Sequence, residues 1–324
     1  MNQIIKYSAI AFSILGSTSS ALAQTTVTPH YSMFMYNKLI YNPAYAGSRN
    51  LTSVNALYRN QWVGVDGAPR NFSVSIDGPV GSYMKPFRHV ALGLSVSNES
   101  AGVLNNTNLM AYYAYRIPVK KTVLSFGLQA GTSMLSAKYS DLNPFQSGDA
   151  ALTKDLKNEM LPNFGAGVYW RGDNFYAGAS VPNLLENFYD KDNKAVNSKE
   201  NRQIRSYYLS GGYVFTLSEN FKLEPQVLGR YAGNGKYQLP ASADFNLSAI
   251  FYDRLMIGAT YRTDQSVEAL IHLQVTKNLN IGYSYDYATK VLNGFTGGSH
   301  EFVLGFDFVR DNNKYINPRF INLF

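Results

Sequence analysis

Side chains suited to acid–base or metal chemistry are few in this sequence. There are four histidines, His30, His89, His272 and His300, and none belongs to a metal-ligand pattern such as His-Glu-x-x-His. His300 and Glu301 are adjacent, but a hydrolase would also need a nucleophile motif such as Gly-x-Ser-x-Gly, which this sequence lacks. The histidines therefore indicate neither a catalytic site nor a metal site.

Cofactor and thiol chemistry are equally unsupported. The glycine clusters 127–131 and 294–298 are not followed by the Lys-Ser/Thr pair that completes a phosphate-binding loop. Asp264 and Glu268 lie close in sequence but have no accompanying nucleophile motif. Because the chain has no cysteine, it forms no disulfide, thiolate metal site or lipoprotein anchor. We expect a non-enzymatic protein with no cofactor and no bound metal.

The elements that would position any site are β-strands. In residues 281–287 and 299–310, bulky apolar side chains alternate with small or polar ones. A period of two places one set of side chains on each face of a strand. The same pattern recurs in about fourteen segments. The predicted strands are 51–63, 70–80, 88–98, 107–119, 122–137, 161–171, 173–182, 205–217, 220–231, 239–252, 254–263, 265–276, 279–288 and 299–310.

The connections between these strands alternate in length. Short polar links, such as the one at Lys120 and Lys121, alternate with long links at 137–160, 182–204, 231–239 and 288–299. Tight turns on one side and long loops on the other are typical of outer-membrane barrels. The sequence therefore predicts an all-β fold, a transmembrane antiparallel β-barrel of about 14 strands with short periplasmic N- and C-terminal tails. Twelve or sixteen strands are also compatible with the pattern.

A soluble β-sandwich would show the same alternation. The 25 tyrosines favour the barrel, because a ring that is apolar at one edge and polar at its hydroxyl suits the aromatic girdles of a membrane protein. The tyrosines expected in these girdles are Tyr58, Tyr169, Tyr207, Tyr261 and Tyr287.

The N-terminus predicts export. Lys6 precedes the apolar run 9–15, and Ala21-Leu22-Ala23 fits a signal-peptidase site. We therefore expect a signal peptide over 1–23 and location in the cell outer membrane. The predicted regions that follow are an N-terminal periplasmic or plug segment (24–50), the barrel (51–310) and a C-terminal periplasmic tail (311–324). The net charge of +7 is scattered along the chain, which suits contact with outer-membrane lipid and does not indicate nucleic acid.

Two motifs resemble a known family. Residues 42–47 read Asn-Pro-Ala-Tyr-Ala-Gly, and 58–69 read Tyr-Arg-Asn-Gln-Trp-Val-Gly-Val-Asp-Gly-Ala-Pro. Together with the Pro-Arg-Phe unit at 318–320, they resemble the PorP/SprF family of type IX secretion membrane proteins. Here Ile321–Phe324 follow that unit, which departs from the family's terminus. The candidate structural or partner-binding residues are Asn42, Pro43, Ala44, Gly47, Gln61, Trp62, Gly67, Pro69, Pro318, Arg319 and Phe320.

The resemblance implies a non-enzymatic outer-membrane component of the type IX secretion system of Bacteroidota. It implies protein binding that helps to secrete or surface-anchor cargo such as adhesins, including those of gliding motility. The implied partners are secreted cargo and adhesin proteins, together with periplasmic or lipoprotein components of the system.

Several alternatives remain open at this stage. A FadL-like or porin-type transporter of a small solute would use residues 24–50 as a hatch, whereas a plain lead-in to the first strand is another interpretation of the same segment. The loops 137–160 and 182–204 either bind partners or fold into the lumen. Trp62 is either an interfacial anchor or part of a recognition surface. The C-terminal tail either docks a periplasmic partner or assists barrel assembly.

Overall fold

A computed structural model of the chain describes residues 30–82, 87–141, 155–187, 203–233, 239–263, 266–289 and 296–309. The predicted signal peptide (1–23), the predicted tail (311–324) with Pro318, Arg319 and Phe320, and Asp264 lie outside these residues.

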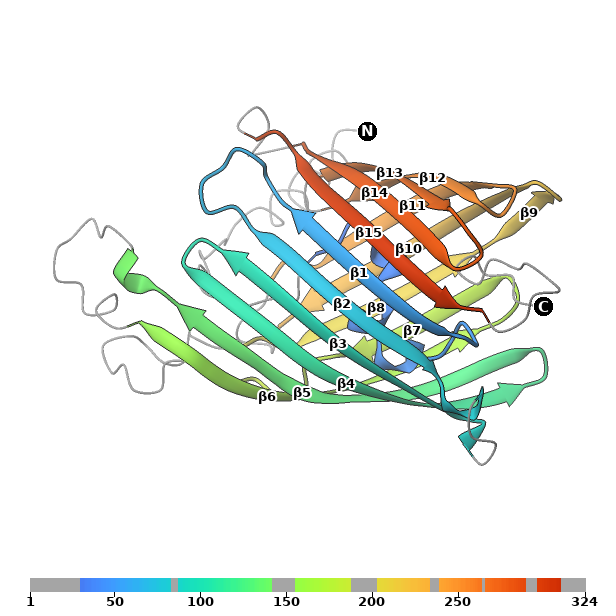
Figure 1. Cartoon of the computed structure of the whole chain (residues 1–324), viewed down its shortest axis with the longest axis horizontal. Helices are drawn as coiled ribbons and strands as arrows, with labels where there is room; N and C mark the ends of the chain where they lie inside the picture. Colours follow the sequence, from blue (N-terminus) through green and yellow to red (C-terminus); the bar gives the residue numbers. More distant parts are fainter. Residues whose placement is uncertain are drawn as a thin grey trace, which may run out of the picture.

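The strands close into a single antiparallel barrel (Figure 1). The strands are β1 (Thr52–Asn60), β2 (Arg70–Pro79), β3 (Val90–Ala101), β4 (Leu104–Val119), β5 (Thr122–Ala137), β6 (Leu156–Arg171), β7 (Phe175–Val181), β8 (Ser206–Tyr213), β9 (Phe215–Ser218), β10 (Phe221–Ala232), β11 (Ser242–Phe251), β12 (Leu255–Arg262), β13 (Ser266–Gln274), β14 (Leu279–Ala288) and β15 (Ser299–Phe308). Apart from β8 and β9, each strand pairs with its neighbours in sequence, and β15 pairs with β1 to close the ring.

β8 and β9 are two parts of one strand. They are separated only by Val214, and both pair with β10. Counted in this way the barrel has fourteen strands, and the predicted fold is confirmed. β6 begins at Leu156 instead of the predicted 161, because the pairing with β5 continues through Glu159 and, beyond an irregularity at 157–158, to Leu156.

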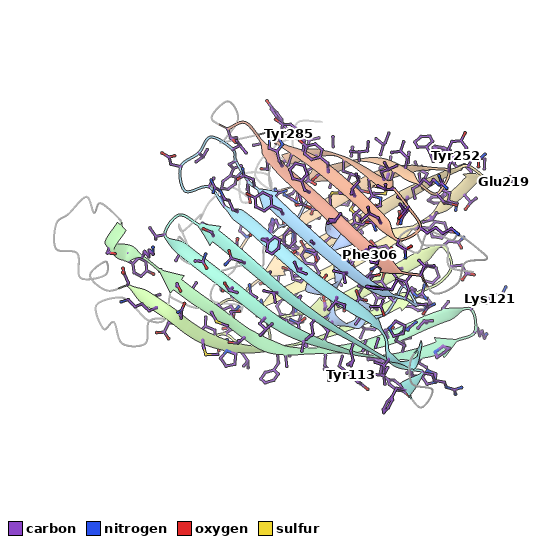
Figure 2. The ribbon with its side chains drawn as sticks, in the orientation of Figure 1. Tyr113, Lys121, Glu219, Tyr252, Tyr285 and Phe306 are labelled. Carbon is purple, nitrogen blue, oxygen red and sulfur yellow. The ribbon has the colours of Figure 1, made fainter. Side chains whose placement is uncertain are left out.

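The two faces of the barrel wall follow the predicted alternation. In β14, Gly282, Ser284 and Asp286 are buried and face inward, while Ile281 and Tyr287 are exposed on the outer face. Figure 2 shows the dense outer layer of side chains, which is apolar and suits a lipid environment. Tyr58, Tyr207, Tyr261 and Tyr287 belong to this outer layer.

Tyr169 is an exception among the predicted girdle tyrosines. It is buried inside the barrel, where its ring packs edge-on against Tyr45 with centroids 5.5 Å apart. The girdle prediction was wrong for this residue, because its position in β6 falls on the inward phase and the lumen supplies an aromatic partner.

The two ends of the barrel differ. The β1–β2 connection (61–69), the end of β5 and the start of β6 lie at one end, on the left in Figure 1, which we call the long-loop end. The tight turns 120–121 and 219–220 lie at the opposite, short-turn end. The β2–β3 connection at the short-turn end is longer and contains η3 (Val80–Ser82), whereas the β3–β4 and β12–β13 connections at the long-loop end are short.

The lumen is occupied by the chain preceding β1. Residues 30–50, which we call the lumen segment, contain three short helical turns: η1 (Phe34–Tyr36), α2 (Lys38–Tyr41) and η2 (Pro43–Tyr45). Tyr31, Met33 and Phe34 are at most 1% exposed. A further turn, η5 (Tyr139–Asp141), follows β5. None of the described helices is long and apolar enough to cross a membrane.

Candidate functional site

The Asn-Pro-Ala motif fixes the lumen segment to the barrel wall. The Asn42 side chain caps η2 by accepting a hydrogen bond from the Ala44 N–H at 2.9 Å. Its amide nitrogen also donates to the Val168 carbonyl of β6 at 3.0 Å. Pro43 follows at the first position of η2, where its missing N–H is not needed. Asn42 thus joins the turn to the wall.

Glycines in the wall make this close contact possible. Ala44 is fully buried opposite Gly127 of β5, and a Cβ at Gly127 would come closer than 3.0 Å to the Ala44 backbone. A Cβ at Gly167 of β6 would come closer than 3.0 Å to the side-chain oxygen of Asn42. We call Gly127 and Gly167 the glycine cradle. At these two positions the chain of the lumen segment lies directly against the strands.

Gly47 directs the chain out of the lumen at the short-turn end. Its φ of +66° favours glycine, and its N–H donates to Asp77 Oδ2 at 2.8 Å. Beyond it, Arg49 forms a buried ion pair with Asp307 at 2.9 Å, and the Ser53 hydroxyl donates to the same carboxylate at 2.7 Å. These contacts secure the last residues before β1.

The wall around the first half of the lumen segment carries a cluster of inward apolar side chains, although most inward positions of the barrel are polar. Tyr31, Met33 and Phe34 form one buried cluster with seven apolar side chains of the wall. These wall residues are Leu57, Tyr208, Leu228, Ile250, Met256, Leu270 and Val303. We call them the apolar ring. This lumen therefore has a hydrophobic core, as a soluble domain does.

The lumen segment contacts opposite sides of the barrel. Tyr36 stacks on His272 of β13 with ring centroids 4.2 Å apart, and the Lys38 ammonium lies 3.6 Å from the centre of the Tyr176 ring of β7. His272 is also hydrogen-bonded to Asn280 at 3.1 Å. His272 therefore packs against the segment and positions it.

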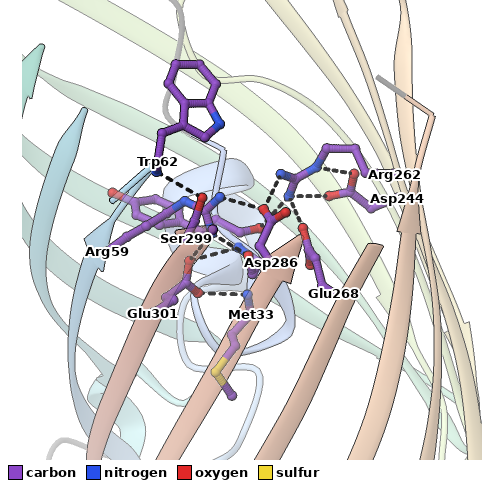
Figure 3. A network of polar contacts seen from close by, with 12 residues as sticks. Met33, Arg59, Trp62, Asp244, Arg262, Glu268, Asp286, Ser299 and Glu301 are labelled. Atoms are coloured by element: carbon purple, nitrogen blue, oxygen red, sulfur yellow. Dashed lines mark hydrogen bonds and ion pairs between the residues drawn. The ribbon is translucent and has the colours of Figure 1, made fainter. Parts of the chain in front are cut away.

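Charged residues form a continuous chain of ion pairs at the long-loop end (Figure 3). Seven strands that are neighbours around the barrel, β10 to β15 and β1, each contribute one residue. The members are Arg230, Asp244, Arg262, Glu268, Asp286, Glu301 and Arg59. We call this set the charged arc. All seven residues are buried.

Arg262 and Arg59 connect the carboxylates of the charged arc. Arg262 lies 2.9 Å from Asp244, 2.8 Å from Glu268 and 3.4 Å from Asp286. Arg59 lies 2.8 Å from Asp286 and 3.2 Å from Glu301. Since Arg262 and Arg59 each bridge two or more carboxylates, they offset the negative charges of the arc in a setting from which water is largely excluded.

Glu301 joins the charged arc to the lumen segment. Its two carboxylate oxygens accept hydrogen bonds from the backbone N–H groups of Ser32, at 2.8 Å, and Met33, at 2.7 Å. Arg59 donates to the Ser32 hydroxyl, and Arg262 donates to the Tyr31 carbonyl at 3.4 Å. The acids Glu268 and Glu301, which the sequence left without a catalytic motif, therefore have structural partners.

The β1–β2 connection forms a platform with two neighbouring loops. Gln61 N–H donates to the Pro69 carbonyl at 2.9 Å, and Gly102 N–H donates to the Gly67 carbonyl at 2.8 Å. Val63 exchanges backbone hydrogen bonds with Gly297 and Gly298, at 2.7 and 2.8 Å. We call residues 61–69 with Gly102 and 296–298 the loop platform.

Trp62 lies at the base of the loop platform. Its φ is +48°, and its backbone N–H donates to the Ser299 hydroxyl at 3.2 Å (Figure 3). The half-buried indole borders a cavity of about 260 Å³ with Asp66, Arg70 and Ser100 among the other lining residues. The platform therefore presents an aromatic ring (Trp62), charged side chains (Asp66 and Arg70) and backbone groups side by side at the long-loop end.

The predicted site residues separate into distinct places. Asn42, Pro43, Ala44 and Gly47 lie inside the barrel, whereas Gln61, Trp62, Gly67 and Pro69 lie in the loop platform. Much of the predicted loops falls outside the described residues, at 142–154 and 188–202. Among the described residues, no group of three or more acids and histidines could hold a metal ion.

Comparison with known proteins gives one family match. The family model described as type IX secretion system membrane protein PorP/SprF matches residues 23–306. A search of curated proteins finds no match.

Solved structures with a similar fold are outer-membrane barrels. Omp33 of Acinetobacter baumannii is 9% identical with a TM-score of 0.46, over 80% of this chain and 98% of that one. The deltaS2S3 mutant of TodX, a monoaromatic hydrocarbon channel, is 10% identical with a TM-score of 0.44, over 83% and 93%. The KdgM porin in complex with disordered oligogalacturonate is 10% identical with a TM-score of 0.37, over 80% and 99%. These similarities concern the fold alone.

Proposed function

The chain belongs to the PorP/SprF family of type IX secretion system membrane proteins, and we propose that it is a non-enzymatic barrel that binds secreted cargo, such as adhesins, through protein–protein contacts. In this role it helps to secrete the cargo or to anchor it at the cell surface. The proposed partners also include periplasmic or lipoprotein components of the secretion system. An outer-membrane location follows from the barrel and the family together.

The filled lumen is the observation that carries this proposal. The lumen segment packs against the apolar ring and is anchored at both ends of the barrel. Emptying the lumen would expose those apolar side chains to water, at a cost of roughly 25 cal/mol for each Å². A barrel with such a core is better suited to binding partners at its ends than to conducting solutes.

The loop platform is the proposed contact for cargo. Long loops of outer-membrane barrels face the cell exterior, which would place the platform on the cell surface. Its backbone hydrogen bonds fix three connections relative to one another, so little conformational entropy remains to be lost on binding. A tryptophan beside a cavity is also the kind of residue that dominates binding energy at protein interfaces.

A cargo-capture experiment tests the platform. The tagged protein is purified from mildly solubilised outer membranes of its host, and co-purifying proteins are quantified by mass spectrometry against an unrelated barrel. We expect type IX cargo and components to be enriched. Trp62→Ala should weaken cargo binding by about 2 kcal/mol, or roughly 30-fold.

The matched control is Tyr252→Ala. Tyr252 is 68% exposed in the β11–β12 turn at the short-turn end, so its loss should leave cargo binding unchanged. Equal losses of cargo from both variants would contradict a platform at the long-loop end. A wild-type barrel that enriches neither cargo nor type IX components would contradict the proposed function.

A conductance measurement separates the proposal from the transporter alternative. We expect the purified protein in planar bilayers to carry no steady ionic current, because the lumen segment contacts opposite walls through Tyr36 and Lys38. A general porin measured under the same conditions provides the positive control. A steady porin-like current through the wild-type protein would favour solute transport instead.

A further inference from the structure

The lumen segment has two parts that are held by different forces. We define the front half as residues 31–41 and the rear half as residues 42–50. We propose that the part of the lumen occupied by the front half is a peptide-binding site, and that the front half is its built-in ligand, released without the rear half. The ligand class is a peptide bearing aromatic and methionine side chains.

The rear half is fixed by shape. Its backbone at Ala44 lies in the glycine cradle, in contact with strands that it cannot leave without a change in the wall. Its exit is secured by the Gly47 hydrogen bond to Asp77 and by the ion pair of Arg49 with Asp307. The rear half therefore behaves as a part of the barrel.

The front half is recognised through its main chain. Glu301 accepts from two successive N–H groups, and the Ser180 hydroxyl donates to the Tyr41 carbonyl at 2.6 Å. Arg262 reaches the Tyr31 carbonyl at 3.4 Å. Wall groups that bind backbone atoms accept many sequences, because every peptide presents the same N–H and C=O groups. The wall therefore has the features of a general peptide site.

The apolar ring supplies the preference among peptides. It surrounds Tyr31, Met33, Phe34 and Tyr36 of the front half. Aromatic and methionine side chains fill such surroundings with large contact areas, and methionine adapts to irregular gaps. A natural ligand would be a segment of a partner protein with this composition, and only this last identification rests on the proposed function.

Glu301 is the residue on which retention of the front half depends. Hydrogen bonds to a charged acceptor contribute about 1.5–3 kcal/mol each, and this carboxylate accepts two from the segment backbone. It is also the charged-arc member that bonds to successive backbone N–H groups of the segment. Loss of its side chain should therefore release the front half while the glycine cradle keeps the rear half.

Single-cysteine labelling tests this release. The chain has no cysteine of its own, so Met35→Cys reports on the front half and Ser48→Cys on the rear half, both positions being buried. We expect slow maleimide labelling of both in the otherwise wild-type barrel. Adding Glu301→Ala should accelerate labelling at position 35 at least about tenfold and leave position 48 unchanged.

A peptide assay tests the vacated site. A fluorescent synthetic peptide of residues 31–41 is titrated onto the folded full-length barrel, and its anisotropy is recorded. Saturable binding is expected for Met33→Asp/Phe34→Asp, in which the built-in front half no longer fits the apolar ring while Glu301 stays in place to accept from the added peptide. No saturable binding is expected for the wild-type chain, in which the site is occupied. This readout needs no cargo, so its failure is distinguishable from failure of cargo capture.

Two further variants complete the design. Glu219→Ala removes an exposed acid in the β9–β10 turn and should change neither labelling nor peptide binding. Glu301→Gln preserves shape and serves in the labelling assay where Glu301→Ala does not yield the folded barrel. The proposal is overturned by equal acceleration at positions 35 and 48, by acceleration at neither, or by absence of saturable peptide binding to the Met33→Asp/Phe34→Asp barrel.

Discussion

Replacement of Arg262 by methionine is expected to lower the free energy of unfolding by about 3–5 kcal/mol, the range for a buried ion pair that loses one partner. Arg262 lies within 3.4 Å of Asp244, Glu268 and Asp286. Methionine keeps much of the side-chain length and removes the charge, so three buried carboxylates lose a shared cation. Chemical denaturation in detergent, followed by tryptophan fluorescence, measures the change.

The matched control is Arg70→Met. Arg70 is the exposed first residue of β2 at the long-loop end, so the same substitution there should change the free energy of unfolding by no more than about 0.5 kcal/mol. If both variants unfold at the same denaturant concentration, the charged arc contributes no more than a surface charge does.

The barrel wall was predictable from sequence because its two environments differ so strongly. Lipid outside and a packed polar interior impose a period of two on every strand, as in residues 281–287. The strand boundaries were accurate to within a few residues, except where β6 extends the wall beyond the predicted start. The interruption of the eighth predicted strand at Val214 could not be read from the alternation. Val214 faces inward, as Ser206 and Tyr208 do, so the period of two continues through it.

The contents of the lumen were harder to predict. Leu57 and Val303 occupy inward positions where the pattern otherwise has polar residues, and these exceptions mark the apolar ring. The signal exists in the sequence, but it becomes readable only once inward and outward phases are known. The aromatic residues of 31–45 could have been matched with such positions to indicate a plug rather than a lead-in.

The charged arc could not have been assembled from sequence alone. Its members come from seven strands, and Arg59 lies more than two hundred residues from Asp286. They meet because the register between strands brings their positions to one level of the barrel. Glu268 and Glu301 could be singled out in the sequence as acids close to Asp264 and His300, but nothing in the sequence associates them with Arg262 and Arg59, their ion-pair partners.

A one-methyl comparison tests how tightly the lumen segment is built into the wall. Gly127→Ala is expected to lower the free energy of unfolding by about 3 kcal/mol, at the upper end for overpacking, because the new Cβ would approach the Ala44 backbone closer than 3.0 Å. Backbone atoms on both sides leave no flexible side chain to move aside.

Gly229→Ala adds the same methyl on the outer face of β10, where the nearest atom is 3.8 Å away. That variant should be unchanged or more stable by about 0.5 kcal/mol, since alanine restricts the unfolded chain. Denaturation of the two variants in the same detergent measures the difference, and equal stabilities would mean that the lumen segment is not seated against β5.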